Sequence, residues 1–281
     1  MTSHPIVVVG AARTPLGNFH GELSSFTAPK LGEIAIKAAL GRAHLSPEHV
    51  SETYMGCVLT AGLGQAPARQ ASLGAGIPES VPCTTINKVC GSGLKTVMIA
   101  YDQLQLGNGE VVVAGGMASM SNAPYLMDKA RGGYRIGHGR IYDHMFLDGL
   151  EDAYEHGKLM GSFAEETAKH LGFSRHQQDE FALRSLARAQ EAQKLGLFVP
   201  EIAPVVLHDR RGESIISVDE LPRLAKPEKI PTLKPVFAEG GTVTAANSSS
   251  ISDGAAAVGL MRQWVAEPMN CPGLAPVAGP A

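Results

Sequence analysis

The 281-residue chain lacks the features that mark several classes of protein. No apolar run approaches the length that crosses a membrane, and the first residues carry no secretory signal pattern. The net charge of −3 favours neither nucleic acid nor an anionic membrane surface as a partner. The four cysteines have neither Cys-x-x-Cys spacing nor a histidine cluster, so we expect no metal site: Cys57, Cys83, Cys90 and Cys271. We therefore expect free thiols in a reducing compartment, the cytoplasm.

The composition is that of a globular protein with many turns. Apolar residues make up 44% of the chain and charged residues 18%, which is typical of a protein with a packed core. The length allows one large domain or two modest ones. The 32 glycines indicate numerous tight turns and close backbone approaches, which are common around ligand sites.

Strand patterns alternate with helical patterns over residues 1–118. Continuous apolar runs at 6–9 and 111–114 are typical of strands buried on both faces. Helical spacing occurs at 31–43 and 67–73, and β-branched residues at 82–86 predict a further strand. This alternation predicts a layered α/β fold with a mixed, mainly parallel sheet. Ligands in such folds gather at the carboxyl ends of the strands.

Residues 119–241 have a different character, and we interpret them as an inserted loop domain. The glycine-rich segment 131–140 predicts a long loop, whose basic residues fit a phosphate, a partner subunit or simply solvent. Capping boxes at Ser162 and Ser174 predict two helices, the second with Ala182, Leu186 and Ala189 on one face. Residues 205–218 predict a hairpin, and 222–235 a proline-rich loop.

The chain then returns to the first sheet. The small residues at 242–262 fit a helix or a strand, and we assign them to the α/β domain together with 1–118. Four prolines and no periodicity mark residues 263–281, so we expect a poorly ordered tail.

Cys90 is the candidate nucleophile because it lies where a strand gives way to a helix. Apolar residues adopt helical spacing from Leu94 onward. The N-terminus of a helix presents unpaired N–H groups and a partial positive charge, which favour a thiolate, the nucleophilic form of cysteine. Gly91 and Gly93 leave room for another group to approach. A small core residue is the alternative interpretation of a lone cysteine.

Several separated segments, in the right order from Ile6 to Met261, resemble the thiolase family. The Asn-Lys-Val-Cys-Gly-Ser-Gly sequence around Cys90 looks like the nucleophile motif of that family. Four other segments are similar to further family motifs: residues 12–15, 115–121, 241–249 and 253–257. No single one of these motifs would identify the family, and the resemblance depends on their occurring together in the same order.

The resemblance implies a fold of two similar α/β halves, with a loop domain inserted in the first. It implies reversible Claisen chemistry on acyl-CoA: two acetyl-CoA giving acetoacetyl-CoA and CoA, or the thiolytic reverse. Cys90 would carry the acyl group, and no cofactor is implied beyond coenzyme A as substrate and product. A homo-oligomer is also implied, a dimer or tetramer, because 132–139 resembles the segment that builds tetramers. The implied CoA contacts are Ser249, Arg223, Leu159, Met160, Phe237 and Ala246.

The resemblance covers only the first half of the family's fold and its loop domain. Family members continue with a half that supplies a histidine in Gly-His-Pro and a cysteine in Cys-x-Gly-Gly-Gly, and neither motif occurs in these 281 residues. We expect acylation of Cys90 without full turnover, because proton removal from the second acetyl group needs a base. A fragment that only binds CoA or pairs with a complete subunit is the alternative. A cysteine hydrolase is a weaker alternative, since no local motif associates a histidine with Cys90.

Overall fold

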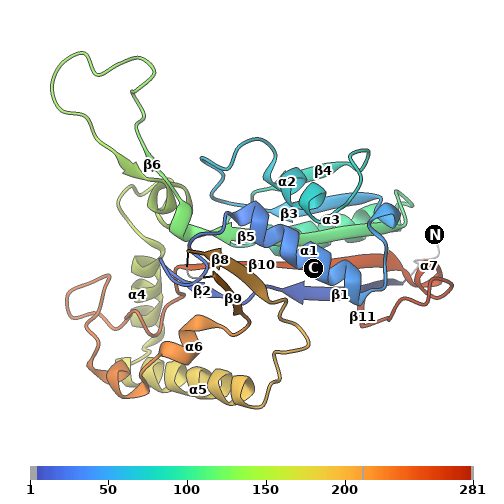
Figure 1. Ribbon diagram of the computed structural model, residues 1–281. Coiled ribbons are helices and arrows are strands. Elements are labelled where there is room, and N and C mark those ends of the chain that lie inside the picture. Colours follow the sequence, from blue (N-terminus) through green and yellow to red (C-terminus); the bar gives the residue numbers. More distant parts are fainter. Residues whose placement is uncertain (1–4, 211, 280–281) are drawn as a thin grey trace.

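The computed structural model describes residues 5–210 and 212–279, and a mixed sheet forms the centre of this part of the chain (Figure 1). The strand order is β11-β1-β10-β5-β3-β4, and the short β2 also pairs with β10. The bounds are β1 Ile6–Arg13, β2 Gly17–Asn18, β3 Glu52–Gly56, β4 Cys83–Ile86, β5 Val111–Ser119, β10 Ser252–Arg262 and β11 Ala275–Val277.

The direction of β10 decides the character of the sheet. It lies between β1 and β5 and runs antiparallel to both. Strands β1, β3, β4 and β5 share one direction, as expected. Among the strands of this sheet that the structure describes, the parallel pairs are β3 with β4 and β3 with β5. The sheet is therefore mixed, and most of its pairings are antiparallel rather than parallel. The small-residue pattern of 252–262 does not reveal this direction, because it fits a strand running either way.

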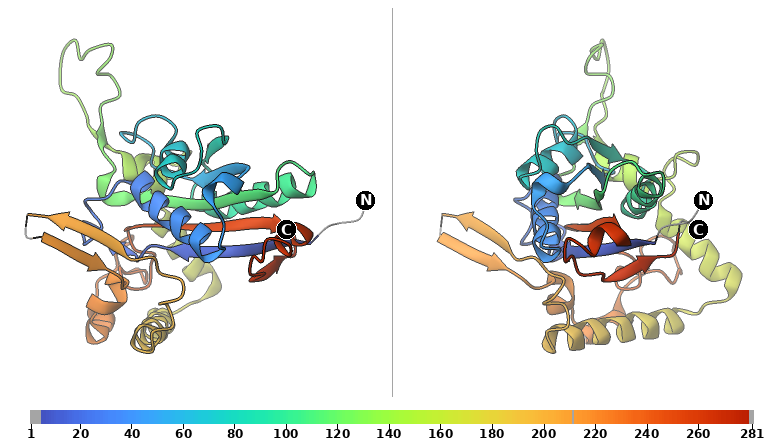
Figure 2. Two further views of the ribbon diagram at one scale, coloured as in Figure 1. Left: turned by 45° about the vertical axis from the view of Figure 1, so that its right-hand side comes forward. Right: turned by 90° about the vertical axis from the view of Figure 1, so that its right-hand side faces the viewer.

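Helices cover both faces of the sheet. Helices α1 (Ala28–Arg42) and α2 (Pro67–Gly74) pack on one face, and α3 (Ser92–Gln105) packs on the other (Figure 2). The alternation along β5 shows the two faces, since Val111 and Val113 join the cluster under α1 while Val112 joins the cluster under α3. A short 3-10 helix, η1 (Pro47–His49), leads into β3.

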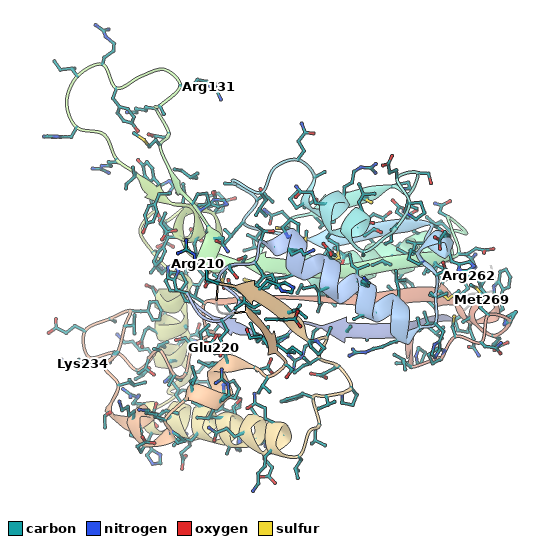
Figure 3. All side chains as sticks on the ribbon, viewed as in Figure 1. Arg131, Arg210, Glu220, Lys234, Arg262 and Met269 are labelled. Carbon is teal, nitrogen blue, oxygen red and sulfur yellow. The ribbon has the colours of Figure 1, made fainter. Side chains whose placement is uncertain are left out.

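The segment from η2 (Met120–Asn122) to η4 (Pro227–Thr232) lies at one end of the sheet (Figure 1). Two short strand pairs belong to it, β6 (Tyr125–Leu126) with β7 (Tyr142–Asp143) and β8 (Val205–Asp209) with β9 (Gly212–Ile216). Its helical elements are a π-helical turn η3 (Phe146–Leu150), α4 (Met160–Leu171), α5 (Arg175–Lys194), α6 (Glu220–Leu224) and η4. The predicted hairpin at 205–218 is confirmed. The loop carrying Arg131 projects from the body, as Figure 3 shows.

Two local predictions in this segment are wrong. Ser162 does not cap a helix, because α4 already begins at Met160 with Leu159 as its N-cap. The prolines of 222–235 do not prevent helix formation, since α6 and η4 lie there, and Pro227 occupies the first turn of η4, where its missing N–H costs nothing. By contrast, both hydrogen bonds of the predicted capping box at Ser174 are present.

The C-terminal tail differs from the poorly ordered segment we expected. It forms α7 (Gln263–Ala266), with Val265 and Ala266 buried, and then β11, which pairs antiparallel with β1. Pro276 is compatible with β11 because this strand lies at the edge of the sheet, where prolines in sheets are found. No helix in the described ranges has both the length and the apolar character needed to span a bilayer.

Candidate active site

Cys90 lies exposed on the turn that joins β4 to α3. Val89 adopts a left-handed backbone conformation with φ of +47°, which an Asn87 side chain supports by accepting a hydrogen bond from the Val89 N–H at 3.0 Å. The Ser92 hydroxyl accepts from the Lys88 N–H at 2.9 Å and donates to the Val89 carbonyl at 2.6 Å. Two side chains of the motif therefore hold the turn that presents the thiol. The predicted position at a strand-to-helix junction is confirmed.

Glycines allow the first turn of α3 to pack closely against the ends of the parallel strands. A Cβ added at Gly56, the last residue of β3, would lie 2.7 Å from the Ser92 carbonyl carbon. A Cβ added at Gly116 in β5 would lie 3.2 Å from the Gly93 Cα. The Thr96 hydroxyl then donates to the Gly115 carbonyl at 2.9 Å. Cys90 is thus fixed at the carboxyl edge of the parallel strands and just before the positive end of the α3 dipole, where negative charge is favoured.

The other thiols are poorly placed for chemistry. Cys57 is 1% exposed, and burial raises its pKa to about 11. Burial also raises the pKa of Cys271. Cys83 is half-buried on β4. Because the thiolate is the reactive form and must be reached by a reagent, Cys90, the exposed thiol of the four, is the best-placed candidate for a nucleophile. Within 5–210 and 212–279 no cluster of three or more His, Cys, Asp or Glu side chains could bind a metal ion.

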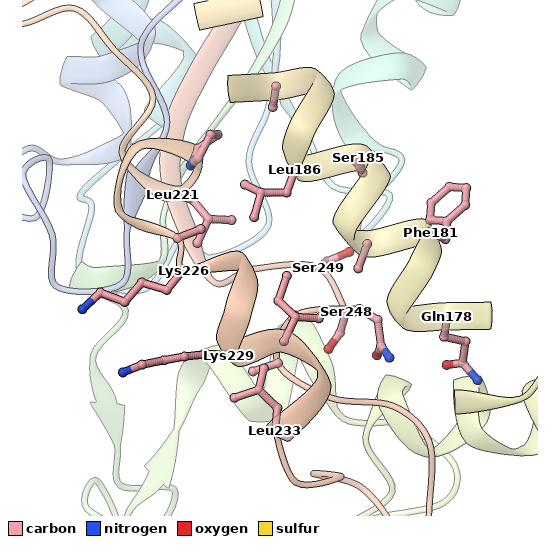
Figure 4. A pocket seen from close by; sticks show the side chains of 18 of the residues that line it. Gln178, Phe181, Ser185, Leu186, Leu221, Lys226, Lys229, Leu233, Ser248 and Ser249 are labelled. Atoms are coloured by element: carbon pink, nitrogen blue, oxygen red, sulfur yellow. The ribbon is translucent and has the colours of Figure 1, made fainter. Parts of the chain in front are cut away.

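A cavity of about 950 Å³ lies between α5, α6, η4 and residues 245–249 (Figure 4). Its volume is in the range of small-molecule sites. Phe181 and Leu186 come from α5 and Leu221 from α6, while Ser248 and Ser249 enter from the irregular segment. Lys226 and Lys229 also line the cavity, but Figure 4 shows their ammonium groups pointing away from α5 and the two serines. The cavity is therefore largely apolar with a few hydroxyl and amide groups.

The structure distributes the six expected CoA contacts over three places. Ser249 and Ala246 line the cavity. Arg223 is directed to the surface, where its guanidinium pairs with Glu22 at 2.7 Å. Leu159 and Met160 lie at the start of α4. Phe237 lies beside them, since a Cβ at Gly161 would meet its ring.

Our sequence interpretation missed most of the cavity wall. The helical spacing predicts that Ala182, Leu186 and Ala189 share one face, without saying what that face meets; the structure shows that they line the cavity, and that Asp179 is the buried residue of α5 in the described chain. Lys229, which falls in the predicted loop 222–235, lies on η4 and lines the cavity as well. An apolar helix face predicts burial but does not distinguish a packed neighbour from an open cavity, so the pattern contained no signal for this wall.

Comparisons with known proteins match this architecture. Residues 6–264 match the family model described as "Thiolase, N-terminal domain". An acetyl-CoA acetyltransferase of Cupriavidus necator is 49% identical over 97% of this chain and 69% of its own length. Acetyl-CoA acetyltransferase 2 of Arabidopsis thaliana is 53% identical over 91% of this chain and 64% of its own length.

Solved structures agree with the sequence relatives. An acetyl-CoA acetyltransferase from Syntrophomonas wolfei superposes with a TM-score of 0.92 at 39% identity, covering 96% of this chain and 68% of that one. The Acat5 thiolase from Ascaris suum, solved in complex with coenzyme A, gives 0.91 at 39% identity over 98% of this chain and 70% of that one. The chain thus spans about two thirds of the length of these relatives. It belongs to the thiolase family, and residues 6–264 are a thiolase N-terminal domain.

Proposed function

We propose that this chain performs the acyl-accepting part of an acetyl-CoA acetyltransferase reaction. The observation that carries the proposal is the placement of Cys90, exposed and just before the N-terminus of α3. The relatives named acetyl-CoA acetyltransferases and the coenzyme A complex of the Ascaris suum thiolase support the choice of an acyl-CoA as substrate. Ser249 and Ala246 in the 950 Å³ cavity supply the expected pantetheine contacts.

The proposed step is a thioester exchange. The Cys90 thiolate bonds to the thioester carbonyl carbon, and the electron pair displaced onto the oxygen returns as the carbon–sulfur bond to CoA breaks. CoA leaves as a thiolate and takes up the proton that the Cys90 thiol released. The product keeps the activation of a thioester, which is the advantage of covalent catalysis here.

Carbon–carbon bond formation is a separate step. It removes a proton from the methyl group of a second acetyl-CoA, for which a base must lie within hydrogen-bond reach. The family resemblance assigns this task to a histidine and a cysteine of the second half, whose motifs these 281 residues do not contain. We therefore propose acylation by this chain without steady acetoacetyl-CoA turnover.

Intact-protein mass spectrometry tests the acyl-enzyme. After incubation with acetyl-CoA and an acid quench, we expect one acetyl group per chain, located at Cys90 by peptide mapping. Cys90→Ser should abolish the adduct, while Cys83→Ser, on the preceding strand, should retain it. An adduct on another cysteine, or none, would refute the assignment. Steady thiolysis of acetoacetyl-CoA by the 281-residue chain would refute the limit to acylation.

A second candidate function is association with another subunit. Three exposed apolar side chains in and beside α3 favour it, because Val89, Leu94 and Leu106 are 50%, 70% and 73% exposed, and exposed apolar groups can mark interaction surfaces. We propose a homo-oligomer, or a pair with a complete thiolase subunit. Light scattering of the chain alone and with a full-length relative tests this, and a monomer in both samples would contradict it. The free thiols fit a reducing compartment such as the cytoplasm.

A further inference from the structure

Residues 241–251 belong to no helix or strand, and residues 245–249 of this segment form one wall of the cavity. The segment has no hydrogen-bond ladder, so its position depends on single bonds. One of them is a backbone bond, from the Val236 N–H to the Val243 carbonyl at 3.0 Å, and the others involve side chains. Its internal bonds fold it onto itself. The Asn247 side chain accepts from the Thr244 N–H at 2.7 Å and donates to the Thr242 carbonyl at 3.1 Å, and the Ser248 hydroxyl donates to the Thr244 carbonyl.

The carboxylate of Glu165 attaches this segment to α4. One oxygen accepts from the Thr242 N–H at 2.7 Å and from the Val243 N–H at 2.6 Å. The other accepts from the same Thr242 N–H at 2.9 Å and from the Thr242 hydroxyl at 3.0 Å. Hydrogen bonds to an ionised acceptor are shorter and stronger than those between neutral groups.

The residues around Glu165 allow its carboxylate to bind the backbone of residues 242–243 closely. A Cβ at Gly241 would lie 2.3 Å from a Glu165 carboxylate oxygen, so the backbone approaches closely because this residue is glycine. Gln178 of α5 donates to the Thr242 hydroxyl at 2.9 Å, which ties the same point to a helix that lines the cavity. Burial opposes ionisation of Glu165, but the bonds from Val243 and Thr242 outweigh it and lower its pKa.

We infer that Glu165 is a positioning residue for the acyl-CoA ligand. It is not among the residues that line the cavity, and acts by fixing residues 242–243, after which Ala246, Ser248 and Ser249 line the cavity. This inference rests on the proposed function, because it assumes that the cavity takes the pantetheine arm of a CoA thioester. Loss of the carboxylate lowers affinity for that ligand and leaves the chemistry at Cys90 intact.

The neighbouring residue provides a matched control. Glu166 is 63% exposed at its side chain and pairs with Lys158 at 2.9 Å on the surface. Glu166→Gln therefore removes the same charge from the same helix without touching the Thr242–Val243 turn. Thr242→Ser keeps the hydroxyl that donates to Glu165, whereas Thr242→Ala removes it.

The test measures CoA affinity by calorimetry and the labelling of Cys90 by acetyl-CoA in single turnover. For Glu165→Gln we expect the Kd and the half-saturating acetyl-CoA concentration to rise about tenfold, while the maximal labelling rate stays within about twofold. Glu166→Gln and Thr242→Ser should match the unmodified chain, and Thr242→Ala should fall between. Unchanged affinity in Glu165→Gln would overturn the inference, and so would a fallen maximal rate with unchanged half-saturation.

Amide hydrogen exchange separates this inference from the proposed function. Without ligand, the amides of 242–249 should exchange at least tenfold faster in Glu165→Gln than in Glu166→Gln. If the unmodified chain fails to bind CoA, the proposed function fails, and exchange alone decides whether Glu165 positions the wall. Equal exchange in the two variants overturns the inference whatever the affinity for CoA. If Glu165→Gln does not fold, the pair Thr242→Ala and Thr242→Ser gives the same decision.

Discussion

In the α/β layer most of the buried side chains are apolar. Residues 119–241 are attached to it partly by apolar contacts of Val205 and Ile216, and partly by charged and polar side chains. Leu31, Ile36 and Met55 are fully buried between sheet and helices. In the attached region, α4 has one fully buried residue, Ala168, and α5 has Asp179, within the described chain. The first region gains stability by removing apolar surface from water.

The attachments of the second region are directional. Arg13 at the end of β1 donates two hydrogen bonds to Asp219, at 2.7 and 3.0 Å, and one to Glu201 at 2.6 Å. Glu220, labelled in Figure 3, accepts from the Asn18 N–H at 2.9 Å and the Glu22 N–H at 3.0 Å. Hydrogen bonds with defined geometry fix a segment without packing its apolar faces together. That difference allows α5 and α6 to keep a cavity open between them.

The largest effect should come from the apolar layer. Leu31→Ala removes a side chain of α1 that is fully buried in the apolar core, and we expect it to lower the free energy of unfolding by about 2–5 kcal/mol. Urea denaturation followed by circular dichroism measures this. Leu106→Ala, at a side chain 73% exposed, should change stability by less than about 0.5 kcal/mol. Equal losses of unfolding free energy in the two variants would contradict the proposed role of the buried apolar side chains.

Loss of the main ionic attachment should have a smaller, more local effect. Arg13→Ala leaves the Asp219 carboxylate, 8% exposed, without its bidentate partner, and we expect a loss of about 1–3 kcal/mol. Limited proteolysis should show earlier cleavage within residues 195–235 than in the layer. The control is Arg223→Ala, whose pair with Glu22 joins side chains each 42% exposed and should contribute at most about 1 kcal/mol. Cleavage that begins in the layer would contradict the prediction.

Acid should weaken the attachment through Glu165. Its pKa is lower in the folded chain than in the unfolded one, because the bonds from Val243 and Thr242 outweigh the opposing effect of burial. A lowered folded pKa means that this contribution to stability is complete above the usual range of glutamate and is lost as the pH falls through the lowered value. The difference in Tm between the unmodified chain and Glu165→Gln should therefore shrink from about pH 6 to about pH 3. A difference that stays constant would show that ionisation of Glu165 does not matter.

The smallest effect should come from the cap of α5. Ser174→Ala removes the hydroxyl that accepts from the Gln177 N–H, and we expect a loss of about 0.5–1 kcal/mol. Ser162→Ala serves as the control because Ser162 lies inside α4, where alanine is at least as good a helix former. Thermal denaturation of both variants measures the two losses of stability. A larger loss for Ser162→Ala than for Ser174→Ala would reverse our assignment of the caps.

The sequence predicted the nucleophile turn well because its signals are local. The β-branched residues before Cys90, the glycines after it and the helical spacing from Leu94 all act within a few residues, and the structure has β4 and α3 at those places. The capping box at Ser174 was recognised for the same reason. The same box pattern at Ser162 was misleading, because α4 begins two residues earlier, at Met160.

By itself, the sequence determined the main strands and helices of residues 1–118, the position of the candidate nucleophile Cys90 between a strand and a helix, and the family to which the motifs point. The tertiary structure decided the antiparallel course of β10, the pairing of β11 with β1, and the use of the apolar face of α5 as a cavity wall. These features depend on contacts between residues far apart in the chain. The attachment of 242–243 by Glu165 is of this kind, since it joins residues 77 and 78 positions apart. A local pattern specifies burial and turn geometry, but only the assembled chain determines which surface meets which.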